Sequence, residues 1–372
     1  MKKKSKFDDY EYKSLSEGQL IFYQFFKHRV GVVSLFVLLI LYIIVIFADF
    51  FSPYGMLTNH KNYLYAPPQI TKIQFFDESG SFYLRPFIYR QEAVRDPKTL
   101  RFVYKGDKSK KDFIYFFVKG EPYEMLGFIE SDIHFFGVKE GKLFLLGTDI
   151  IGRDLLSRII FGGRVSLSIG LIGVIILVFI GTIIGTISGY YGGLVDDLIQ
   201  RFIEIIRTIP QIALWMAIAA VIPKEWPSTY VYLGIVIIFG FISWAGLARE
   251  VRGKVLALRS SDFINAARAY GASNIRIIFL HIIPNVYSHV IVIATLSIPI
   301  MIIGEAALSF LGLGIKPPMT SWGLLLTQLR EVQTLKHYPW LICPAGFIVT
   351  SVLCFNFCLF SSSYFYLYPD DW

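Results

Sequence analysis

Several apolar stretches of this chain are long enough to cross a lipid bilayer, and they constrain the fold more than any other feature. A helix needs roughly 20 apolar residues to span a hydrocarbon core about 30 Å thick. Hydrophobic residues make up 54% of the 372 residues, more than in an average soluble protein. We therefore predict an all-α polytopic membrane protein with six transmembrane helices. Their approximate residues are 30–51, 165–191, 210–223 (lengthened by 202–208), 230–247, 286–310 and 340–359.

Basic residues set the expected orientation in the membrane. They cluster before the first span and between the fourth and fifth spans, at Lys2, Lys3, Lys4, Lys6, Lys13, Lys27 and Arg29, and at Arg249, Arg252, Lys254, Arg259, Arg268 and Arg276. Short basic segments stay in the cytoplasm, so we expect both regions there. Six spans then return the C-terminus to the same side. The net charge of +8 is explained by this topology, and no nucleic-acid partner is expected.

The segment between the first and second spans has a different character. Stretches such as KIQFF and SFYLRPFIY alternate apolar and polar residues between turns, which is typical of strands. We predict a small β-rich extracytoplasmic insertion whose aromatic residues form its own core. The predicted organisation is a cytoplasmic segment (1–29), a first transmembrane helix (30–52), the insertion (53–146), a transmembrane domain of five helices (147–360) and a C-terminal tail (361–372).

Sequence motifs of nucleotide, metal and nucleophile chemistry are missing. The chain contains no GxxxxGK[ST], HExxH, CxxC or GxSxG pattern. His281 and His289 are eight residues apart, but Pro284 between them disturbs a shared helix face. We therefore expect no catalytic residue, no metal site and no cofactor bound by this chain. The three cysteines lie in the sixth span, where they are expected to be small apolar fillers.

A positively charged segment, INAARAYGASNIRIIFLHIIPN, covers residues 264–285 just before the fifth span. Ser260, Ser261 and Asp262 are good helix caps, and Gly271 can end the helix that follows in a left-handed turn. Ser273 can cap a second helix, and Pro284 is predicted to break or bend the entry to the fifth span. The sequence thus predicts a helical elbow at the cytoplasmic surface. Physics alone leaves two interpretations open, a docking arm for a protein or a connector held by anionic lipid.

The spacing of Ala266, Ala267, Gly271 and Pro284 resembles the cytoplasmic signature loop of ABC importer permeases, in which Glu-Ala-Ala is followed by Gly and then Pro. Asn265 stands where that family usually has Glu. Longer stretches are similar to the C-type permease of oligopeptide and dipeptide importers. They are LGTDIIGRDLLSRIIFGGRVSLSIG (146–170), GYYGGLVDDLIQRFIEIIRTIP (189–210), EAALSFLGLGIKPPMTSWG (305–323) and PWLICPAGFIVT (339–350), and the similarity runs from about 146 to 356.

This resemblance implies the MetI-like fold of ABC importer permeases in the bacterial inner membrane. It also implies partners: a second homologous permease, two cytoplasmic ABC ATPases that bind the ATP, an extracytoplasmic peptide-binding protein and the lipid bilayer. Peptide is the expected substrate, with nickel or another small solute as the alternative. A secondary transporter is a less favoured class, because it would need paired charges deep inside the spans.

The resemblance also points to site residues. Residues 248–284 are expected to form the loop that couples to the ATPases, with contacts at Asn265, Ala266, Ala267, Arg268, Gly271, Ala272 and Pro284. Glu305 and Ser309, near the outer end of the fifth span, are candidates for a gate or translocation path. A structural hydrogen bond to the turn GLGIKPP is the preferred interpretation of that pair. Thr148, Asp149, Arg153 and Asp154 are expected to organise the outer loop rather than bind substrate.

Overall fold

Long helices form most of the computed structural model, which describes residues 25–95, 97, 102–223 and 225–367, with side chains described through residue 360. Five helices are long and apolar enough to cross a membrane. They are α3 (Arg29–Ile46), α5 (Leu155–Tyr191), α8 (Ser228–Leu258), the helical run Asn274–Phe310 that contains α11 (Ile283–Phe310), and the run Pro339–Phe360 that leads into α14 (Cys343–Leu367). The chain is therefore a polytopic helical protein, as predicted.

The predicted third span is a bent pair of helices. α6 (Gly193–Thr208) and α7 (Gln211–Ala219) meet at an angle of 82°, and together they pass the length and hydropathy test for a span. α7 alone has nine residues, too few to cross a bilayer. Pro210 lies at the bend, where its missing N–H and fixed φ favour a break in the helix.

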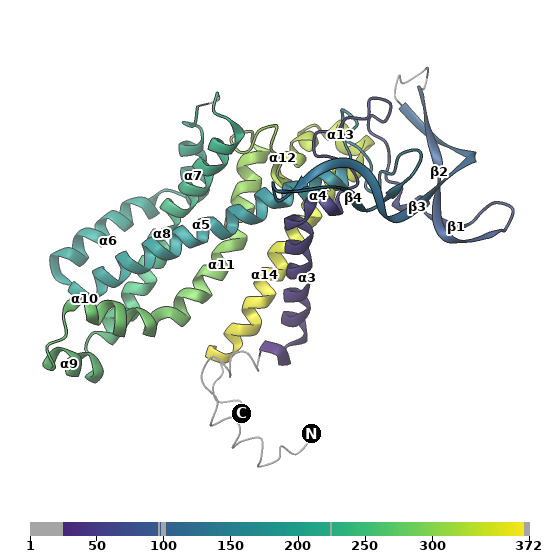
Figure 1. The fold of residues 1–372 in the computed structure, drawn as a ribbon. Coiled ribbons are helices and arrows are strands. Elements are labelled where there is room, and N and C mark those ends of the chain that lie inside the picture. The colour runs from purple at the N-terminus through teal and green to yellow at the C-terminus, as the bar shows by residue number, and fades with distance from the viewer. Residues whose placement is uncertain (1–24, 96, 98–101, 224, 368–372) are drawn as a thin grey trace, which may run out of the picture.

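Helix α5 is the centre of the bundle and packs along α8 and against α11 (Figure 1). Small residues bring the α5 and α8 backbones together. A Cβ atom added at Gly185 would lie 2.5 Å from the carbonyl oxygen of Ala248, so only glycine fits there. Gly181 and Gly185 of the GTIIG stretch therefore lie at a close approach of the two helices, as small residues at this spacing commonly do in transmembrane helices. At the side of the bundle, α3 packs mainly against α14, so the first and last long helices form a pair.

The first span is interrupted near its outer end, because α3 stops at Ile46 and α4 (Ala48–Phe51) begins one residue later. Arg164 of α5 holds this break in place. Its guanidinium donates hydrogen bonds to the carbonyl oxygens of Val45 and Ile46, each at 2.9 Å, and pairs with Asp49 at 2.6 Å. One side chain thus satisfies the last carbonyls of α3 and anchors the outer end of the first span to the bundle.

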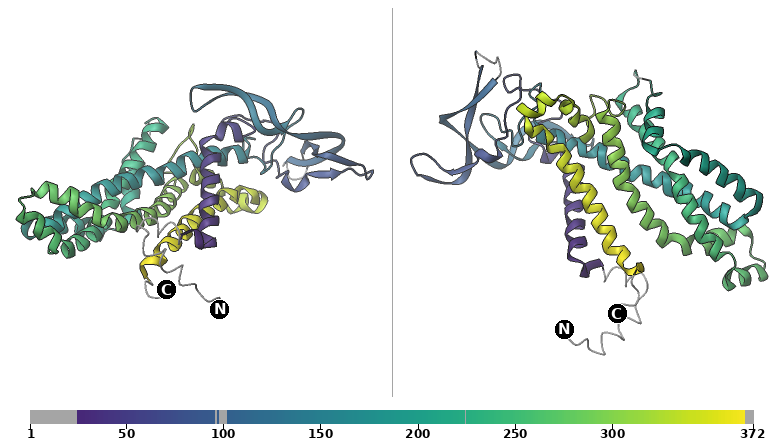
Figure 2. Two further views of the ribbon diagram at one scale, coloured as in Figure 1. Left: turned by 60° about the horizontal axis from the view of Figure 1, so that its bottom comes forward. Right: turned by 180° about the vertical axis from the view of Figure 1, so that it is seen from behind.

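Between α4 and α5 lies the predicted β-rich insertion, a four-stranded antiparallel sheet in the order β1-β2-β3-β4 (Figures 1 and 2). Its strands are β1 (Gln74–Phe76), β2 (Phe82–Arg95), β3 (Phe102–Met125) and β4 (Ile129–Val138). The prediction that its aromatic residues form its core is only partly right. Phe87 is fully buried, whereas Phe116, Phe117 and Phe128 are each more than half exposed. A single sheet has two faces, and this one has too few other elements around it to cover both.

The shorter elements connect these parts. They are η1 (Ile70–Lys72), α9 (Asp262–Ala269), α10 (Asn274–Arg276), η2 (Ile277–Ile282), α12 (Trp322–Leu326), η3 (Thr327–Arg330), α13 (Val332–His337) and η4 (Pro339–Ile342). The helix of the sixth span continues to Leu367, seven residues into the predicted tail of 361–372. The remaining tail residues, and residues 1–24 of the predicted N-terminal segment, lie outside the described part of the chain.

Of the break or bend predicted at Pro284, the break is absent. The helical run from Asn274 to Phe310 is continuous, and residues Ile277–Ile282 adopt the wider π-helical form. Pro284 lies in the first turn of α11, directly after this π segment. Proline lacks an N–H, so it cannot donate the usual helical hydrogen bond to the carbonyl four residues earlier. In a π turn the backbone bonds join residues five apart, and this change of partners next to Pro284 lets the helix continue.

Candidate functional site

The elbow before the fifth span is a pair of short helices joined by a tight turn. α9 ends at Ala269, and Gly271 follows in the left-handed region with φ +77°. The N–H of Ala272 bonds to the carbonyl oxygen of Ala267 at 3.0 Å, and the N–H of Gly271 to that of Arg268 at 2.9 Å. These two bonds form a Schellman motif, so the glycine stop that the sequence predicts is confirmed. The predicted cap is also confirmed, since Ser273 Oγ accepts from the N–H of Arg276 at 3.4 Å.

The inner face of the elbow is fixed to the bundle. Ile264 and Ile277 are fully buried in the main hydrophobic core. At the end of α5, the Tyr190 hydroxyl donates to Asn274 Oδ1 at 2.8 Å, and the guanidinium of Arg268 lies 5.2 Å from the Tyr190 ring centroid. Apolar packing, a hydrogen bond and a cation–π contact therefore join the elbow to α5. A movement of one requires a movement of the other.

The outer face of the elbow carries large apolar side chains with no cover. Tyr270, beside the glycine turn, is 93% exposed, Ile275 is 70% exposed, and Phe263 is 42% exposed. Exposed apolar side chains that lie together in this way mark a contact surface for a protein or a membrane. The elbow therefore has an anchored side and an open apolar side.

The predicted contact residues divide between these two sides. The open side includes Asn265, Ala266 and Gly271, whereas Ala267 and Ala272 are half-buried against the bundle. Arg268 is exposed but lies over the Tyr190 ring on the anchored side. Pro284 is away from the turn, in α11. Residues 249–258 of the predicted loop 248–284 continue α8 as a helix. Tyr190 and Tyr270 were not predicted as site residues, and nothing in their sequence neighbourhood distinguishes them from ordinary interfacial tyrosines.

A half-buried ion pair braces the bundle behind the elbow. Arg252 of α8 donates two hydrogen bonds to Asp196 of α6, each at 2.5 Å, and Ser188 of α5 donates to the same carboxylate at 2.5 Å. Gln200 donates to Ser188 Oγ at 3.1 Å. The two bonds from Arg252 and the one from the Ser188 hydroxyl satisfy both carboxylate oxygens of Asp196, and together they connect α5, α6 and α8. These ends of the three helices are thus held together near the elbow.

Glu305 and Ser309 are fully buried and hydrogen-bonded to each other and to neighbouring helices. Glu305 accepts from Ser309 Oγ at 2.7 Å and from Ser166 Oγ of α5 at 2.8 Å. Ser309 Oγ in turn accepts from the N–H of Ile315, within the GLGIKPP turn, at 3.0 Å. The structural hydrogen bond preferred in the sequence analysis is therefore present.

The outer loop is organised by the residues expected to do so. Thr148 Oγ1 accepts from the N–H of Ala66 at 2.7 Å, and Asp149 pairs with Arg153 at 2.7 Å. Asp154 caps α5 by accepting from the N–H of Ser157 at 2.7 Å. Nearby, the ring of His60 lies 4.8 Å from the ring of Tyr54 and 5.2 Å from that of Phe144, measured between centroids. Burial, helped by Lys142, lowers the pKa of His60 to about 4.

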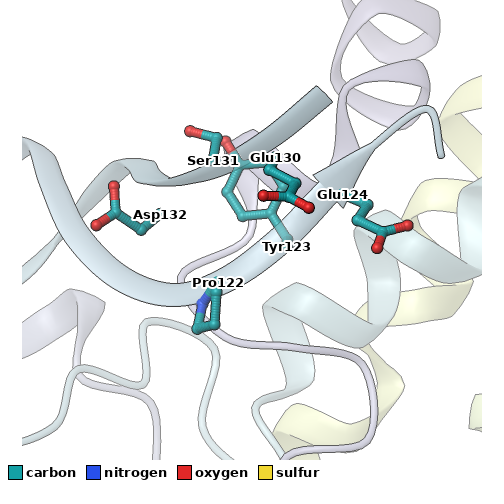
Figure 3. A pocket seen from close by; sticks show the side chains of 6 residues that line it. All are labelled: Pro122, Tyr123, Glu124, Glu130, Ser131 and Asp132. Carbon is teal, nitrogen blue, oxygen red and sulfur yellow. The ribbon is translucent and has the colours of Figure 1, made fainter. Parts of the chain in front are cut away.

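A wide hollow of about 660 Å³ lies on the β3–β4 hairpin (Figure 3). It is lined by Pro122, Tyr123, Glu124, Glu130, Ser131 and Asp132. Glu124 and Glu130 are direct partners in the strand ladder, an arrangement of like charges that weakens pairing. In the described part of the chain, no group of three or more His, Cys, Asp and Glu residues is placed to hold a metal ion.

Comparisons with known proteins agree on one family. The model of the binding-protein-dependent transport system inner membrane component matches residues 178–368, and the model of the N-terminal TM domain of oligopeptide transport permease C matches residues 16–68. The oligopeptide transport system permease protein OppC of Haemophilus influenzae is 45% identical over 219 residues, covering 59% of this chain and 68% of that protein.

Two further relatives with the same printed name show the same extent of similarity. The protein of Escherichia coli strain K12 is 42% identical over 215 residues, covering 57% of this chain and 68% of the relative. The protein of Bacillus subtilis strain 168 is 36% identical over 211 residues, covering 56% of this chain and 67% of the relative.

Proposed function

Because this chain belongs to the family of binding-protein-dependent transport system inner membrane components, we propose that it is the C-type permease subunit of an ATP-driven importer of oligopeptides or dipeptides. The family model covers more than half of the chain, and the relatives named above are oligopeptide permeases. The chain is a transporter subunit rather than an enzyme, and a multi-pass protein of the bacterial inner membrane. ATP hydrolysis belongs to separate subunits of such an importer.

In the proposed topology the chain crosses the membrane six times, with the bent pair α6–α7 as the third span. The N- and C-termini and the elbow face the cytoplasm, and the sheet lies outside. Two features support this arrangement. One basic cluster precedes α3, and the other runs from the C-terminal end of α8 through the elbow. The elbow and the sheet lie at opposite ends of the helices, and α3 begins at the end of the bundle where α9 lies (Figure 1).

The elbow is proposed to dock into a cytoplasmic ABC ATPase, and the geometry of its two sides is the observation that carries this role. Tyr270 and Ile275 offer an exposed apolar surface, while Tyr190 fixes the opposite side to α5. The contact is proposed to include Asn265, Ala266, Ala267, Arg268, Gly271 and Ala272. Closing of the ATPases on ATP then displaces the elbow, and α5 transmits this displacement to the packed α8 and α11.

A second permease subunit and an extracytoplasmic peptide-binding protein are proposed to complete the importer. The second permease would cover the polar, exposed face of α6, which includes the Arg201–Glu204 ion pair. Such charges are costly against lipid. Pro284 is proposed to act within the helix behind the elbow rather than at the ATPase contact.

Glu305 and Ser309 are proposed to brace α5, α11 and the GLGIKPP turn rather than to form a gate. Their complete burial and mutual hydrogen bonds support this role. A carboxylate that already accepts bonds from two hydroxyl groups is poorly available to a passing substrate.

Site-specific crosslinking tests the proposed docking. A photo-crosslinking residue is placed at Tyr270 in cells that express the whole importer, and the same residue is placed at Phe116 of the sheet as a control. The position-270 variant is expected to join an ATPase subunit, and the position-116 variant is not. Absence of any ATPase adduct at 270 in an importer that takes up peptide would contradict the docking role.

A further inference from the structure

A small hollow of about 210 Å³ lies where the α6–α7 bend meets α5, α8 and α11. We call it the polar recess and define it by its polar lining residues: Arg207, Gln211, Ser243, Glu250 and Ser297. An adjoining hollow of about 260 Å³ shares Arg207, Gln211 and Ser243 with it. The two views of Figure 2 show the same helices gathered on one side of the molecule.

Part of this recess lies within the predicted spans. Ser243 lies in the fourth predicted span (230–247) and Ser297 in the fifth (286–310), whereas Glu250 lies on the part of α8 that extends past the fourth span. Polar and charged groups at this depth are costly against lipid tails, so they face protein or a water-filled space. A break in a transmembrane helix is also tolerated at membrane depth only where it is buried or lines a cavity. The bend at Pro210 and the polar side chains thus point to the same water-accessible space.

The residues of the recess use their polar groups only in part. Gln211 Nε2 donates to Ser243 Oγ at 2.9 Å, and Glu250 lies 3.5 Å from His289 Nε2. Arg207 has no hydrogen-bond or ion-pair partner among the residues that the structure describes, and its side chain is exposed. Arg207 and Glu250 do not form an ion pair with each other, although they line the same hollow. A free cation and a largely free anion therefore face a common space.

We propose that the polar recess binds the backbone of the transported peptide during its passage, an inference that rests on the proposed peptide importer function. Arg207 binds the C-terminal carboxylate, and Glu250 binds the N-terminal ammonium group. Gln211 and Ser243 hydrogen-bond to peptide amides. Every unmodified peptide carries these groups whatever its side chains, so such a site recognises peptides as a class without selecting a sequence.

The size of the recess indicates that it is one wall of a site. Pockets that enclose a small ligand usually measure about 300–1,000 Å³, and this hollow is smaller and open. The exposed side of Arg207 leaves room for an opposite wall, which the second permease subunit supplies. Short peptides whose two ends reach both charged groups are expected to depend on the recess most.

Uptake of end-blocked peptides tests this assignment. The complete importer is reconstituted in proteoliposomes with its ATPases and binding protein. The probes are trialanine with free ends, C-terminally amidated trialanine and N-acetylated trialanine. Each variant is compared with the unsubstituted importer for the same probe, so that the preference of the binding protein cancels.

Arg207→Gln is expected to lower the uptake rate of free trialanine about tenfold and to leave the amidated peptide unchanged. Glu250→Gln is expected to lower uptake of the free peptide and to leave the acetylated peptide unchanged. Arg207→Lys should keep much of the wild-type discrimination, because it keeps the charge. Arg85→Gln is the control. It removes the same charge at an exposed side chain of β2, away from the recess and from α6, and it should change no probe selectively.

The outcomes separate this inference from the proposed function. If the unsubstituted importer carries trialanine but Arg207→Gln and Glu250→Gln affect all three probes equally, the recess does not bind peptide ends and the importer function stands. If both variants lose the second permease subunit on purification, the recess is a subunit contact instead. If the unsubstituted importer carries none of the peptides, the proposed function and the inference fall together.

Discussion

Substitution of Gly271 separates strain in the elbow from obstruction of its docking surface. Gly271 has φ +77°, and a Cβ atom added there would meet nothing within 4 Å. Alanine therefore introduces no clash, and its cost is that of the left-handed conformation, roughly 1–2 kcal/mol. That energy corresponds to a factor of roughly 5–30 in the population of the formed turn. Asparagine tolerates this conformation better, so Gly271→Asn should cost less than Gly271→Ala.

Larger effects must come from docking, because the space around Gly271 is open in this chain. Gly271→Arg and Gly271→Asp are expected to reduce peptide uptake to background while the protein still inserts and folds. Aspartate has nearly the shape of asparagine, so a difference between Gly271→Asp and Gly271→Asn measures the added charge at the contact. Gly253→Arg is the control for Gly271→Arg. Gly253 also has no atoms near its added Cβ, and it lies in α8 rather than in the turn.

The assay is peptide uptake by cells that lack the chromosomal importer, normalised to the amount of permease in the membrane. Stimulated ATP hydrolysis by the purified importer gives a second measurement. Near-normal uptake by Gly271→Arg would refute the docking argument. A loss of uptake that parallels a loss of membrane-inserted protein would show that the turn is needed for folding instead.

Three further predictions concern the contacts behind the elbow and at the outer side. Tyr190→Phe removes the hydrogen bond to Asn274, which is worth about 0.5–1.5 kcal/mol. This variant should lower the rate of peptide uptake more than the rate of ATP hydrolysis. An unchanged ratio of the two rates would show that Tyr190 does not transmit the movement of the elbow. Glu305→Gln should retain peptide uptake because the amide oxygen can still accept the hydrogen bond from Ser166, whereas Glu305→Ala should lower the melting temperature of the protein. Loss of uptake in Glu305→Gln at a normal protein level would indicate that Glu305 forms a gate. His60 stays neutral in the fold with a pKa of about 4 against 6.5 in the unfolded chain, so outer-loop stability should be complete above pH 6.5 and fall between pH 6.5 and 4. The protection of that loop against hydrogen exchange, after correction for the intrinsic pH dependence of amide exchange, should become independent of pH over this range in His60→Phe. A protection profile unchanged from that of the unsubstituted protein would exclude His60 as the cause.

The long spans and the glycine turn could be predicted from sequence because each depends on local properties. Uninterrupted apolar runs mark the long helices, and a left-handed stop needs glycine at one position. The third span was harder to define, because α6 carries charged residues such as Arg201 along its exposed side. These charges lower the hydropathy averaged over the helix, so the average does not reveal that the other side of α6 is apolar. At Pro284 the rule for an isolated helix predicts a break, but packing of the π segment keeps the run continuous.

The contacts that give the site its rigidity could not be predicted. Tyr190 and Asn274 are 84 residues apart, and Arg252 and Asp196 are 56 residues apart. A single sequence contains no signal that pairs such distant residues. The polar recess is of the same kind, because it combines residues from four helices whose relative rotation only the fold defines.

The pairing of α3 with α14 has a consequence for biogenesis. The helix that leaves the ribosome first finds its main neighbour only when the last one has been synthesised. Until then lipid must solvate the side of α3 that α14 later covers. Release of the chain before α14 is complete would leave α3 held to the bundle by its smaller contact with α5, which includes the hydrogen bonds of Arg164. Quality-control proteases would then meet an unfinished permease through this loosely attached helix.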